Sequence, residues 1–583
     1  MSEQNKLDGI RHSLAHLLAA AVLEKYPKTK LAIGPTIEHG FYYDFKFPKA
    51  VSVEELKGFE KTMRKLIAQK LPFSGRKVTA AEAKKIFKDQ PFKLELIKEF
   101  VKDKKPLTVY KTGDIFLDLC RGGHVKSTSA INPDAFALTH LAGAYWRGSE
   151  KNPMLTRIYG LAFATKKELE VYLAMLEEAK KRDHRKLGAE LELFTFDERV
   201  GKGLPLWLPA GTIVKNEVEK LAIEMEEKYG YERVSTPHVA KKELYETSGH
   251  LPYYADGMYP PMKMDDGTYY LRAMNCPHHH VIYGARPRSY RELPLRLAEY
   301  GTVYRNELSG TLAGLLRVRM LSMNDAHIYC RKDQIEEEFK RVLDLNLEYF
   351  KLFGLTDYSF RLSLGDPKNK TKFVNEPANW KYAESVLRAI MKKSGVKFTE
   401  APGEAAFYGP KVDVQVRSVI GREETMSTIQ LDFAAKTRFN LVYQDKNGKE
   451  NNEVFVIHRA PLSTHERFIA FLIEHYAGNF PAWLSPVQAK VLPVAEAHTR
   501  YAENVVAALK GRHIRAKLSP ADETLGKRIR AAELEKTPYI LVVGEKEESV
   551  KTVNVRRRHR KETETVPLEK FASAVEEEIR NRK

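Results

Sequence analysis

The stretch Arg296–Cys330, RLAEYGTVYRNELSGTLAGLLRVRMLSMNDAHIYC, is the most informative part of this chain. It reads as two strands joined by a glycine-containing loop, the first ending at Arg305–Glu307 and the second carrying Arg317 and Arg319. Residues two apart on a strand point to the same face, so Arg305 and Glu307 would lie together. Arginine can bind a phosphate in a fork and glutamate can accept from a purine amine, which suits a nucleoside triphosphate. A salt-bridged hairpin explains the pair equally well.

Length and composition limit the class of protein. A chain of 583 residues predicts three or four domains of roughly 100–200 residues each. An apolar run of about 18 residues is absent from the sequence, and the N-terminus lacks a signal-peptide core, so we expect no membrane span and no export. Three cysteines are too few for a disulfide framework and indicate the reducing cytoplasm. The net charge of +19 favours a polyanionic partner, although a merely basic protein would show it too.

Changes in pattern along the chain predict its domains. Residues 1–164 mix strands and helices, and residues 165–190 form a charged helical linker that begins with a capping box at Thr165–Glu168. In 191–486, strands and helices do not alternate regularly, which indicates an antiparallel sheet with flanking helices. In 487–583, short apolar strands alternate with helices, which indicates a small α/β domain with a largely parallel sheet. The fold class is therefore a multidomain α+β and α/β protein.

Three residues far apart in the sequence could form one metal site. They are Cys276 in MNCPHHH, His327 in NDAHIYC and His458 in VIHRAP. One thiolate and two imidazoles suit zinc, and three protein ligands leave a coordination position open for a substrate. Distant cysteines and histidines usually do not meet, and nearby residues of the same types offer other combinations. These are His278, His279, His280 and Cys330.

A second cluster is suggested near the N-terminus. His12 and His16 stand four residues apart in RHSLAHLLAAAV, on one face of a helix, and Cys120 and His124 have the same spacing in DLCRGGHV. These residue types could hold a second zinc ion. They could also form a metal-free hydrolytic pocket in which an imidazole activates water. An ordinary helix with one buried and one exposed histidine is the simplest alternative.

Over nearly its whole length the chain resembles the threonyl-tRNA synthetases of bacterial type, a family of class II aminoacyl-tRNA synthetases. The matching strings occur in family order: GLPLWLPAGTIV, VSTPHVAKKELYETSGH, LRAMNCP, the RNE string of Arg305–Glu307, AFYGPK, IQLDF and HRAPLSTHERF. The resemblance implies an editing domain in 1–164, a class II catalytic domain in 191–486 and an anticodon-binding domain in 487–583. It also implies a homodimer formed through motif 1, with Pro237 as the motif's proline.

The implied reaction is ATP-dependent ligation of L-threonine to tRNA(Thr) through a threonyl-adenylate, with Mg²⁺ on the ATP and one zinc ion per subunit. By this resemblance the catalytic residues would be Arg305, Arg467 and Lys411. The resemblance assigns zinc to Cys276, His327 and His458, the ATP phosphates to Arg305, Arg317 and Arg467, the adenine to Glu307, and the threonine and adenylate pocket to Asp325, Tyr408, Lys411 and Gln430.

The same resemblance implies a correcting activity and an RNA-binding end. His12, His16, Cys120 and His124 match the family's editing domain, which hydrolyses serine from mischarged tRNA; we favour the metal-free version of that pocket. The anticodon-binding domain carries its basic residues in KTVNVRRRHRK. Strand alternation would place Arg556 and Arg558 on one face, and arginine can stack on the bases of a single-stranded loop. A solvated edge strand is the alternative. Asn554 and Glu545 are further candidates for base contacts.

Some positions depart from the family pattern. Met323 stands where the family commonly has a glutamine, MNCPHHH replaces MNCPGH, and CRGGH replaces CRGPH. Met1–Arg11 precede His12, so we expect the family's N-terminal ubiquitin-like domain to be missing. Two other functions remain open: a class II synthetase for another amino acid, and a non-catalytic synthetase-like RNA-binding protein. The zinc trio argues against the first, and Arg305 with Arg467 argues against the second.

Overall fold

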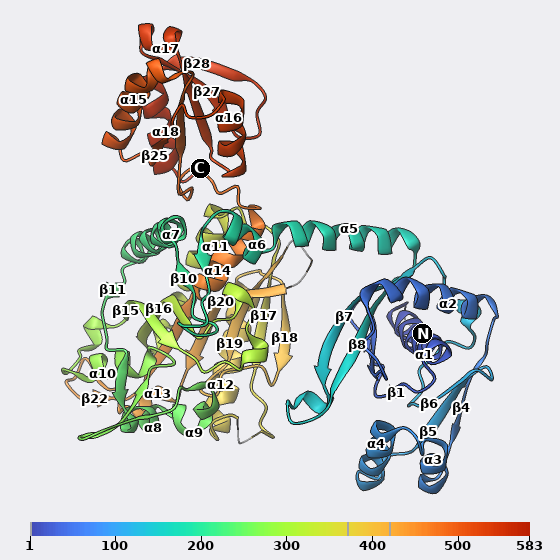
Figure 1. The fold of residues 1–583 in the computed structure, drawn as a ribbon. Helices are drawn as coiled ribbons and strands as arrows, with labels where there is room; N and C mark the ends of the chain where they lie inside the picture. The colour runs from blue at the N-terminus through green and yellow to red at the C-terminus, as the bar shows by residue number, and fades with distance from the viewer. Residues whose placement is uncertain (1–2, 370–371, 419–420, 422) are drawn as a thin grey trace. The chain divides into compact units, whose positions relative to one another are not determined.

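The computed structural model describes residues 3–369, 372–418, 421 and 423–583 (Figure 1). The chain forms two compact units, Met1–Glu177 and Glu178–Lys583, which divide inside helix α5 (Lys166–Arg182). The predicted capping box is confirmed, because Glu168 N donates to Thr165 Oγ1 at 3.2 Å and Thr165 N donates to Glu168 Oε2 at 3.3 Å. The expected single linker helix is wrong: Asp183 caps a new helix, α6 (His184–Glu190), by accepting from Arg185 N. In the described part of the chain, no helix is long and apolar enough to cross a membrane.

The N-terminal unit is built around helix α1 (Glu3–Lys25), whose middle turns are buried. Leu14, Leu17 and Leu18 pack in one core with Phe41 and Phe45 of the antiparallel sheet β1-β3-β8-β7, and a second sheet has the order β4-β5-β6. The strands are β1 (Lys30–Leu31), β2 (Thr36–Ile37), β3 (Gly40–Lys46), β4 (Phe73–Lys77), β5 (Thr108–Thr112), β6 (Phe116–Leu119), β7 (Phe136–Tyr145) and β8 (Met154–Ala162), and the other helices are α2 (Leu56–Ala68), α3 (Ala80–Ile86) and α4 (Pro91–Lys102).

The centre of the second unit is a sheet of order β11-β15-β16-β23-β20-β19-β17-β18, and its interior pairs are antiparallel as predicted. The outermost pairs, β11 with β15 and β17 with β18, are parallel. The strands are β11 (Glu232–Arg233), β15 (Leu295–Tyr304), β16 (Met320–Arg331), β17 (Tyr358–Leu364), β18 (Phe398–Pro402), β19 (Lys411–Arg417), β20 (Glu423–Asp432) and β23 (Val454–Ala460).

Four of the helices, α7, α11, α12 and α14, share the main hydrophobic core of this sheet. Smaller strands complete the unit, including the sheet β12-β14-β13. The helices are α7 (Pro209–Lys228), α8 (Lys242–Ser248), α9 (His250–Tyr253), α10 (Cys276–Gly284), α11 (Ile335–Leu352), α12 (Pro377–Lys393), α13 (Ala435–Arg438) and α14 (His465–His475), and the small strands are β9 (Phe194–Thr195), β10 (Leu206–Trp207), β12 (Val239–Lys241), β13 (Met262–Met264), β14 (Gly267–Leu271), β21 (Tyr443–Gln444) and β22 (Glu450–Asn451).

The predicted hairpin exists, but both of its strands are shorter on the side of the loop than expected. β15 stops at Tyr304 and β16 starts at Met320, so Arg305, Glu307 and Arg317 lie in the connecting loop. The ladder ends because Asn306 N donates to Gly257 O, outside the hairpin, and Glu307 N turns back to Arg305 O at 2.8 Å. The argument from strand alternation for Arg305 and Glu307 was therefore wrong, although both side chains still face one site.

The last part of the chain folds as an α/β sheet of order β25-β24-β26-β27-β28 with helices on both sides (Figure 1). The predicted parallel pairing holds for β24, β25 and β26, whereas β27 and β28 are antiparallel. The elements are β24 (Ala489–Pro493), α15 (Thr499–Gly511), β25 (Ala516–Leu518), α16 (Leu525–Leu534), β26 (Tyr539–Val543), α17 (Glu545–Val550), β27 (Thr552–Arg557), β28 (Thr563–Pro567) and α18 (Leu568–Arg580).

Candidate active site and metal-binding clusters

One cavity of about 360 Å³ gathers the residues predicted for the catalytic site. They come from the hairpin loop, from the adjacent strands β16, β23, β20 and β19, from the segment that precedes β19, and from the first turns of α10 and α14. Strand register explains their meeting, since His458 lies opposite both His327 and Gln430, and Gln430 lies opposite Lys411. The predicted residues that line the cavity are Cys276, Arg305, Glu307, Arg317, Asp325, His327, Tyr408, Lys411, Gln430, His458 and Arg467.

Cys276, His327 and His458 form a compact cluster in the lining of this cavity. One ligand atom from each of the three lies within 4.8 Å of the others, and all three residues are buried. Burial raises the pKa of the Cys276 thiol and lowers the pKa of His327 well below its ordinary value. A divalent cation would reverse the preference of the thiol, because it stabilises the thiolate. The donor set and its spacing therefore fit zinc.

The other histidines and the other cysteine near this cluster lie in different environments. Cys330 is buried in the main hydrophobic core, away from the cluster. His280 offers a nitrogen to another group of possible ligands, together with Asp432 and His458. His279 Nδ1 lies 2.8 Å from Nδ1 of His327, a contact that residue types and spacing did not suggest.

The same cavity is also lined by positively charged side chains, among them Arg305, Arg317 and Arg467. Arg467 Nε donates to Leu316 O at 3.1 Å, and Arg317 pairs with Glu307 at 2.8 Å. Burial lowers the pKa of Arg467, and the positive charges of Arg305 and Arg317 lower it further. Three guanidinium groups that repel one another in a partly dry cavity would be stabilised by a polyanion such as a triphosphate.

Polar side chains complete the lining of the cavity. Tyr408 donates a short hydrogen bond to Gln430, and Lys411 pairs with the buried Asp413 at 2.9 Å. Asn275 Nδ2 donates to Asp325 Oδ2 at 3.0 Å. Asp413, which sequence reasoning missed, holds the Lys411 ammonium group.

Met323 also lines the cavity, at the position that departs from the family pattern. Its side chain packs in a small hydrophobic cluster with Val303, Val318 and Leu321. The substitution therefore leaves an apolar wall beside the hairpin loop, where a glutamine would have offered an amide.

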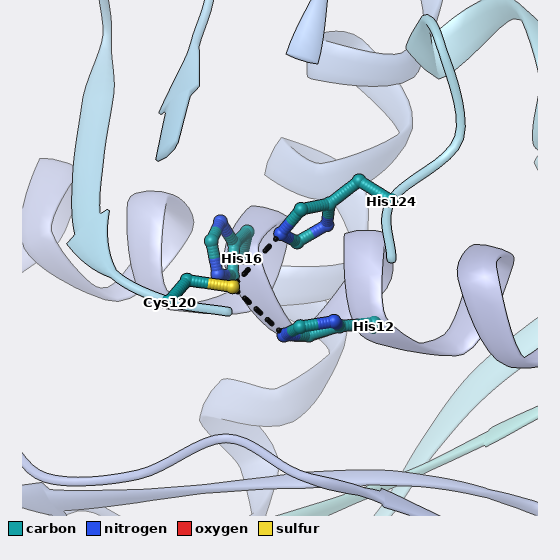
Figure 2. Close-up of side chains that lie close together, drawn as sticks. All are labelled: His12, His16, Cys120 and His124. Carbon is teal, nitrogen blue, oxygen red and sulfur yellow. Dashed lines mark hydrogen bonds between the residues drawn. The ribbon is translucent and has the colours of Figure 1, made fainter. Parts of the chain in front are cut away.

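The second predicted cluster forms inside the N-terminal unit. Figure 2 shows the Cys120 sulfur between the rings of His12 and His124, at 3.3 Å and 3.2 Å from their Nε2 atoms, with His16 beside them. Burial raises the pKa of the Cys120 thiol to about 11 and lowers the pKa of His124 to about 2. The four groups are therefore neutral at pH 7, a state in which imidazole can act as a base or bind a metal.

A buried ionic network adjoins this cluster, and sequence reasoning missed it. Lys93 Nζ lies 2.5 Å from Asp118 Oδ1 and donates to Tyr43 Oη at 3.1 Å, and Tyr43 Oη donates to Asp118 Oδ2 at 2.6 Å. Lys93 is 2% exposed and Asp118 is 3% exposed. His16 Nε2 is 3.9 Å from Asp118, so the carboxylate connects the network to the cluster. The only signals in the sequence were a lysine within an apolar helix and an aspartate within an apolar strand.

The basic segment at the end of the chain divides into two kinds of arginine. Arg556 lies in β27, next to Asn554 Nδ2, which donates to Thr565 Oγ1 at 3.1 Å. Arg558 lies beyond the strand, and its guanidinium donates to the backbone carbonyls of Lys536, Asn479 and Phe480. Both arginines line one pocket, and Arg558 N still donates to Pro538 O just past the end of β27, but the Arg558 guanidinium is held by carbonyls of the chain itself. Glu545 opens helix α17.

Three family profiles match this chain. Residues 261–476 match the tRNA synthetase class II core domain (G, H, P, S and T), residues 488–578 match the anticodon binding domain, and residues 107–159 match the threonyl and alanyl tRNA synthetase second additional domain. These matches confirm the predicted fold class.

Proteins of known name extend the likeness over almost the whole chain. It is 49% identical to a threonine--tRNA ligase of Geobacillus kaustophilus over 99% of this chain and 88% of the relative, and 49% identical to threonine--tRNA ligase 1 of Bacillus subtilis over 96% and 87%. A crystal structure of the RNA binding domain of threonyl-tRNA synthetase from Cryptosporidium parvum is 36% identical, with a TM-score of 0.65, and covers 68% of this chain and 98% of that chain.

Proposed function

Since the chain belongs to the threonine--tRNA ligase family and ligates threonine to tRNA, we propose that the cavity around Cys276, His327 and His458 is where threonine is activated. The observation that supports this most is the convergence of a zinc-type donor set and three arginines on one cavity of about 360 Å³. The Cys/His cluster suits an amino acid and the arginines suit a triphosphate, as the first half-reaction requires.

In that half-reaction the carboxylate of threonine attacks the α-phosphate of ATP in line, and pyrophosphate leaves. The charge on the phosphates is neutralised by Arg305, Arg317 and Arg467. Lys411 adds a further positive charge beside the reacting groups. Glu307, which pairs with Arg317 in the structure, leaves that arginine and itself contacts the adenine. Mg²⁺ on the phosphates would add to this neutralisation. The adenylate then passes its acyl group to the terminal ribose of tRNA(Thr), and no protein nucleophile takes part.

Cys276, His327 and His458 would hold zinc, one ion per subunit, with Asp325, Tyr408 and Gln430 around the amino acid. When bound, zinc would supply a Lewis acid that both the amine and the hydroxyl of threonine can coordinate. Valine has no hydroxyl, so the site rejects it. Serine keeps both groups and lacks one methyl, a difference of about 1–3 kcal/mol. The pocket therefore accepts serine at a low rate, and a correcting activity is needed.

The N-terminal cluster supplies that activity in this account. His12, His16, Cys120 and His124 hydrolyse seryl-tRNA: water attacks the ester carbonyl and the bond to the ribose oxygen breaks, which releases serine. We favour a metal-free pocket, in which the Cys120 thiol is hydrogen-bonded to His12 and His124. A neutral imidazole can take the proton of the attacking water. The second additional domain matched at residues 107–159 supports an editing role.

The remaining partners follow from the same family membership. We propose that residues 487–583 bind the anticodon of tRNA(Thr), with Arg556, Asn554 and Glu545 as contacts, and that Arg558 contributes mainly by holding this part of the chain in place. We also propose a homodimer through the segment containing Pro237, working in the cytoplasm, where tRNA and ATP are available.

The test is ATP–pyrophosphate exchange with each amino acid supplied singly. We expect fast exchange with threonine, slow exchange with serine and background exchange with valine and proline. Exchange that is fastest with another amino acid would contradict the assignment of the pocket, and exchange with none would favour a non-catalytic RNA-binding protein.

A further inference from the structure

Both histidines of the metal cluster have one ring nitrogen hydrogen-bonded to another buried side chain. A neutral imidazole carries a hydrogen on one nitrogen and a lone pair on the other, and only the lone pair can bind a metal ion. The partner of the bonded nitrogen therefore decides which nitrogen of His327 and of His458 is available to a cation.

For His458 the partner is a carboxylate. His458 Nε2 lies 3.0 Å from Asp432 Oδ2, and a carboxylate oxygen accepts, so Nε2 carries the hydrogen and Nδ1 the lone pair. The other oxygen of Asp432, Oδ1, accepts from the backbone N–H groups of Ala434 at 2.7 Å and Ala435 at 3.0 Å. These bonds fix the carboxylate in one orientation, and Asp432 is 4% exposed, so water has little access to it.

For His327 the carboxylate acts through a second histidine. His279 Nε2 lies 3.1 Å from Glu299 Oε2 and donates to it, so a neutral His279 has its lone pair on Nδ1. His279 Nδ1 lies 2.8 Å from His327 Nδ1 and can therefore only accept, which places the hydrogen of His327 on Nδ1. The lone pair of His327 is left on Nε2.

Two further side chains hold Glu299 in place. Arg272 Nη1 donates to its Oε1 at 3.1 Å, and Thr236 donates through its backbone N–H at 3.1 Å and its hydroxyl at 2.7 Å. Arg272 is 1% exposed, Glu299 4% and His279 0%. The charge of Glu299 is thus compensated by Arg272, which holds the carboxylate where it accepts from His279.

We propose that Asp432, directly, and Glu299, through His279, are positioning residues that set the metal-binding tautomers of His458 and His327. The inference rests on the proposed zinc site and adds the residues that prepare it. Each ligand then carries its hydrogen on the nitrogen that is bonded to its buried partner, so that the other nitrogen can bind a cation without a tautomer change.

The sharpest test is D432N in the full-length protein. The asparagine keeps the size of the side chain, and its oxygen stays with the backbone N–H groups of Ala434 and Ala435, so its NH₂ group faces His458 Nε2. That group donates and moves the hydrogen of His458 to Nδ1, the nitrogen proposed to bind zinc. We expect zinc affinity, measured by competition with a chelator, to fall about 10–100-fold, with an altered absorption spectrum in the cobalt-substituted protein.

A pair of variants at His279 separates tautomer control from packing. H279A removes the acceptor for His327, whereas H279N offers an amide oxygen near the position of Nδ1. We expect H279A to weaken zinc binding about 10–100-fold and H279N to stay within a few-fold of wild type. Equal weakening in both would overturn the proposal, because packing alone would then explain the loss.

Two controls complete the design. E338Q neutralises another buried carboxylate of the same unit. Glu338 pairs with Arg296 and is not part of the network around the two histidines, so this variant should bind zinc as the wild-type protein does. H280N tests the alternative ligand group of His280, Asp432 and His458; a loss there equal to that of D432N would place the metal on that group and overturn the inference. Wild-type protein without zinc would contradict the proposed zinc site itself, whereas zinc-loaded wild type and equally tight D432N would contradict the tautomer proposal alone.

Discussion

His327 and His458 lie opposite each other on the antiparallel strands β16 and β23, within reach of Cys276 at the start of α10. Two strands of one sheet therefore fix two of the three proposed zinc ligands relative to each other, and a helix brings the third. Rigid elements of this kind hold ligands more accurately than loops do.

Removal of the thiol should remove the metal. We expect C276A to contain background zinc and to lose threonine-dependent ATP–pyrophosphate exchange, because two histidines hold zinc far more weakly than a thiolate with two histidines. Metal analysis of the purified protein and the exchange assay measure the two effects. C330A is the matched control, since Cys330 lies in the hydrophobic core; zinc loss in that variant would contradict the assignment.

Arg467 should matter for the reaction more than for binding of threonine. Truncation in R467A removes a donor aimed at the phosphates and should lower kcat for exchange on the order of 10²–10³-fold. R388A removes an arginine that is paired with Glu400 outside the cavity, and we expect near wild-type exchange. If R467A kept its kcat, the assignment of the cavity's arginines to ATP would be wrong.

The N-terminal cluster should be separable from ligation. We expect H12A and H124A to deacylate seryl-tRNA(Thr) at least about 100-fold more slowly while threonylation is unchanged, because general-base catalysis contributes about 10²–10⁴-fold. Release of labelled serine measures the first rate. H39A, outside the cluster, is the control. A metal-free pocket further predicts one zinc per chain, and two would favour the metal-bound alternative.

Removing only one charge of the Lys93–Asp118 pair should lower the stability of the protein. K93M leaves the Asp118 charge buried without its partner, which costs about 3–5 kcal/mol of stability. The double variant K93M/D118L removes both charges and should recover much of that loss. Calorimetry of the full-length protein measures both. A double variant less stable than K93M would show that the network contributes more than mutual neutralisation.

The stability of the N-terminal unit should depend on pH through His124. Burial, together with repulsion from His16 and His12, lowers its pKa from 6.5 to about 2. Below pH 6.5 the unfolded chain takes up a proton at His124 that the folded chain does not, so the free energy of unfolding falls as the pH falls. Thermal unfolding between pH 7.5 and pH 5 should show this slope, and H124N should reduce it. Equal slopes in the two proteins would contradict the prediction.

The two arginines of the last domain should behave differently. R556A should weaken binding of tRNA(Thr) by about 1–3 kcal/mol and reduce the salt dependence of binding. R558A should instead lower thermal stability, because it removes donors to three backbone carbonyls. Filter binding at several salt concentrations distinguishes them. A larger loss of tRNA binding in R558A would restore the original expectation for that residue.

Residue types and family strings predicted the cavity well, because Cys276, His327 and His458 sit in recognisable segments. The limits of the strands were less predictable: Arg305 looked like part of a strand, yet Asn306 turns to Gly257 O, a partner from another part of the chain. Lys93, Asp118, Glu299 and Asp432 were missed for a related reason. Each derives its role from one tertiary contact, and a buried charge has no local pattern in a sequence.

The central claim is that threonine activation depends on a metal held by Cys276, His327 and His458, and metal depletion tests it most directly. ATP–pyrophosphate exchange with threonine is measured in the purified protein, after exhaustive chelation, and after addition of Zn²⁺ at one equivalent per chain. We predict exchange that is lost on chelation and restored by zinc in the wild-type protein, but not in C276A. Full threonine-dependent exchange in chelated protein with no residual metal would contradict the account.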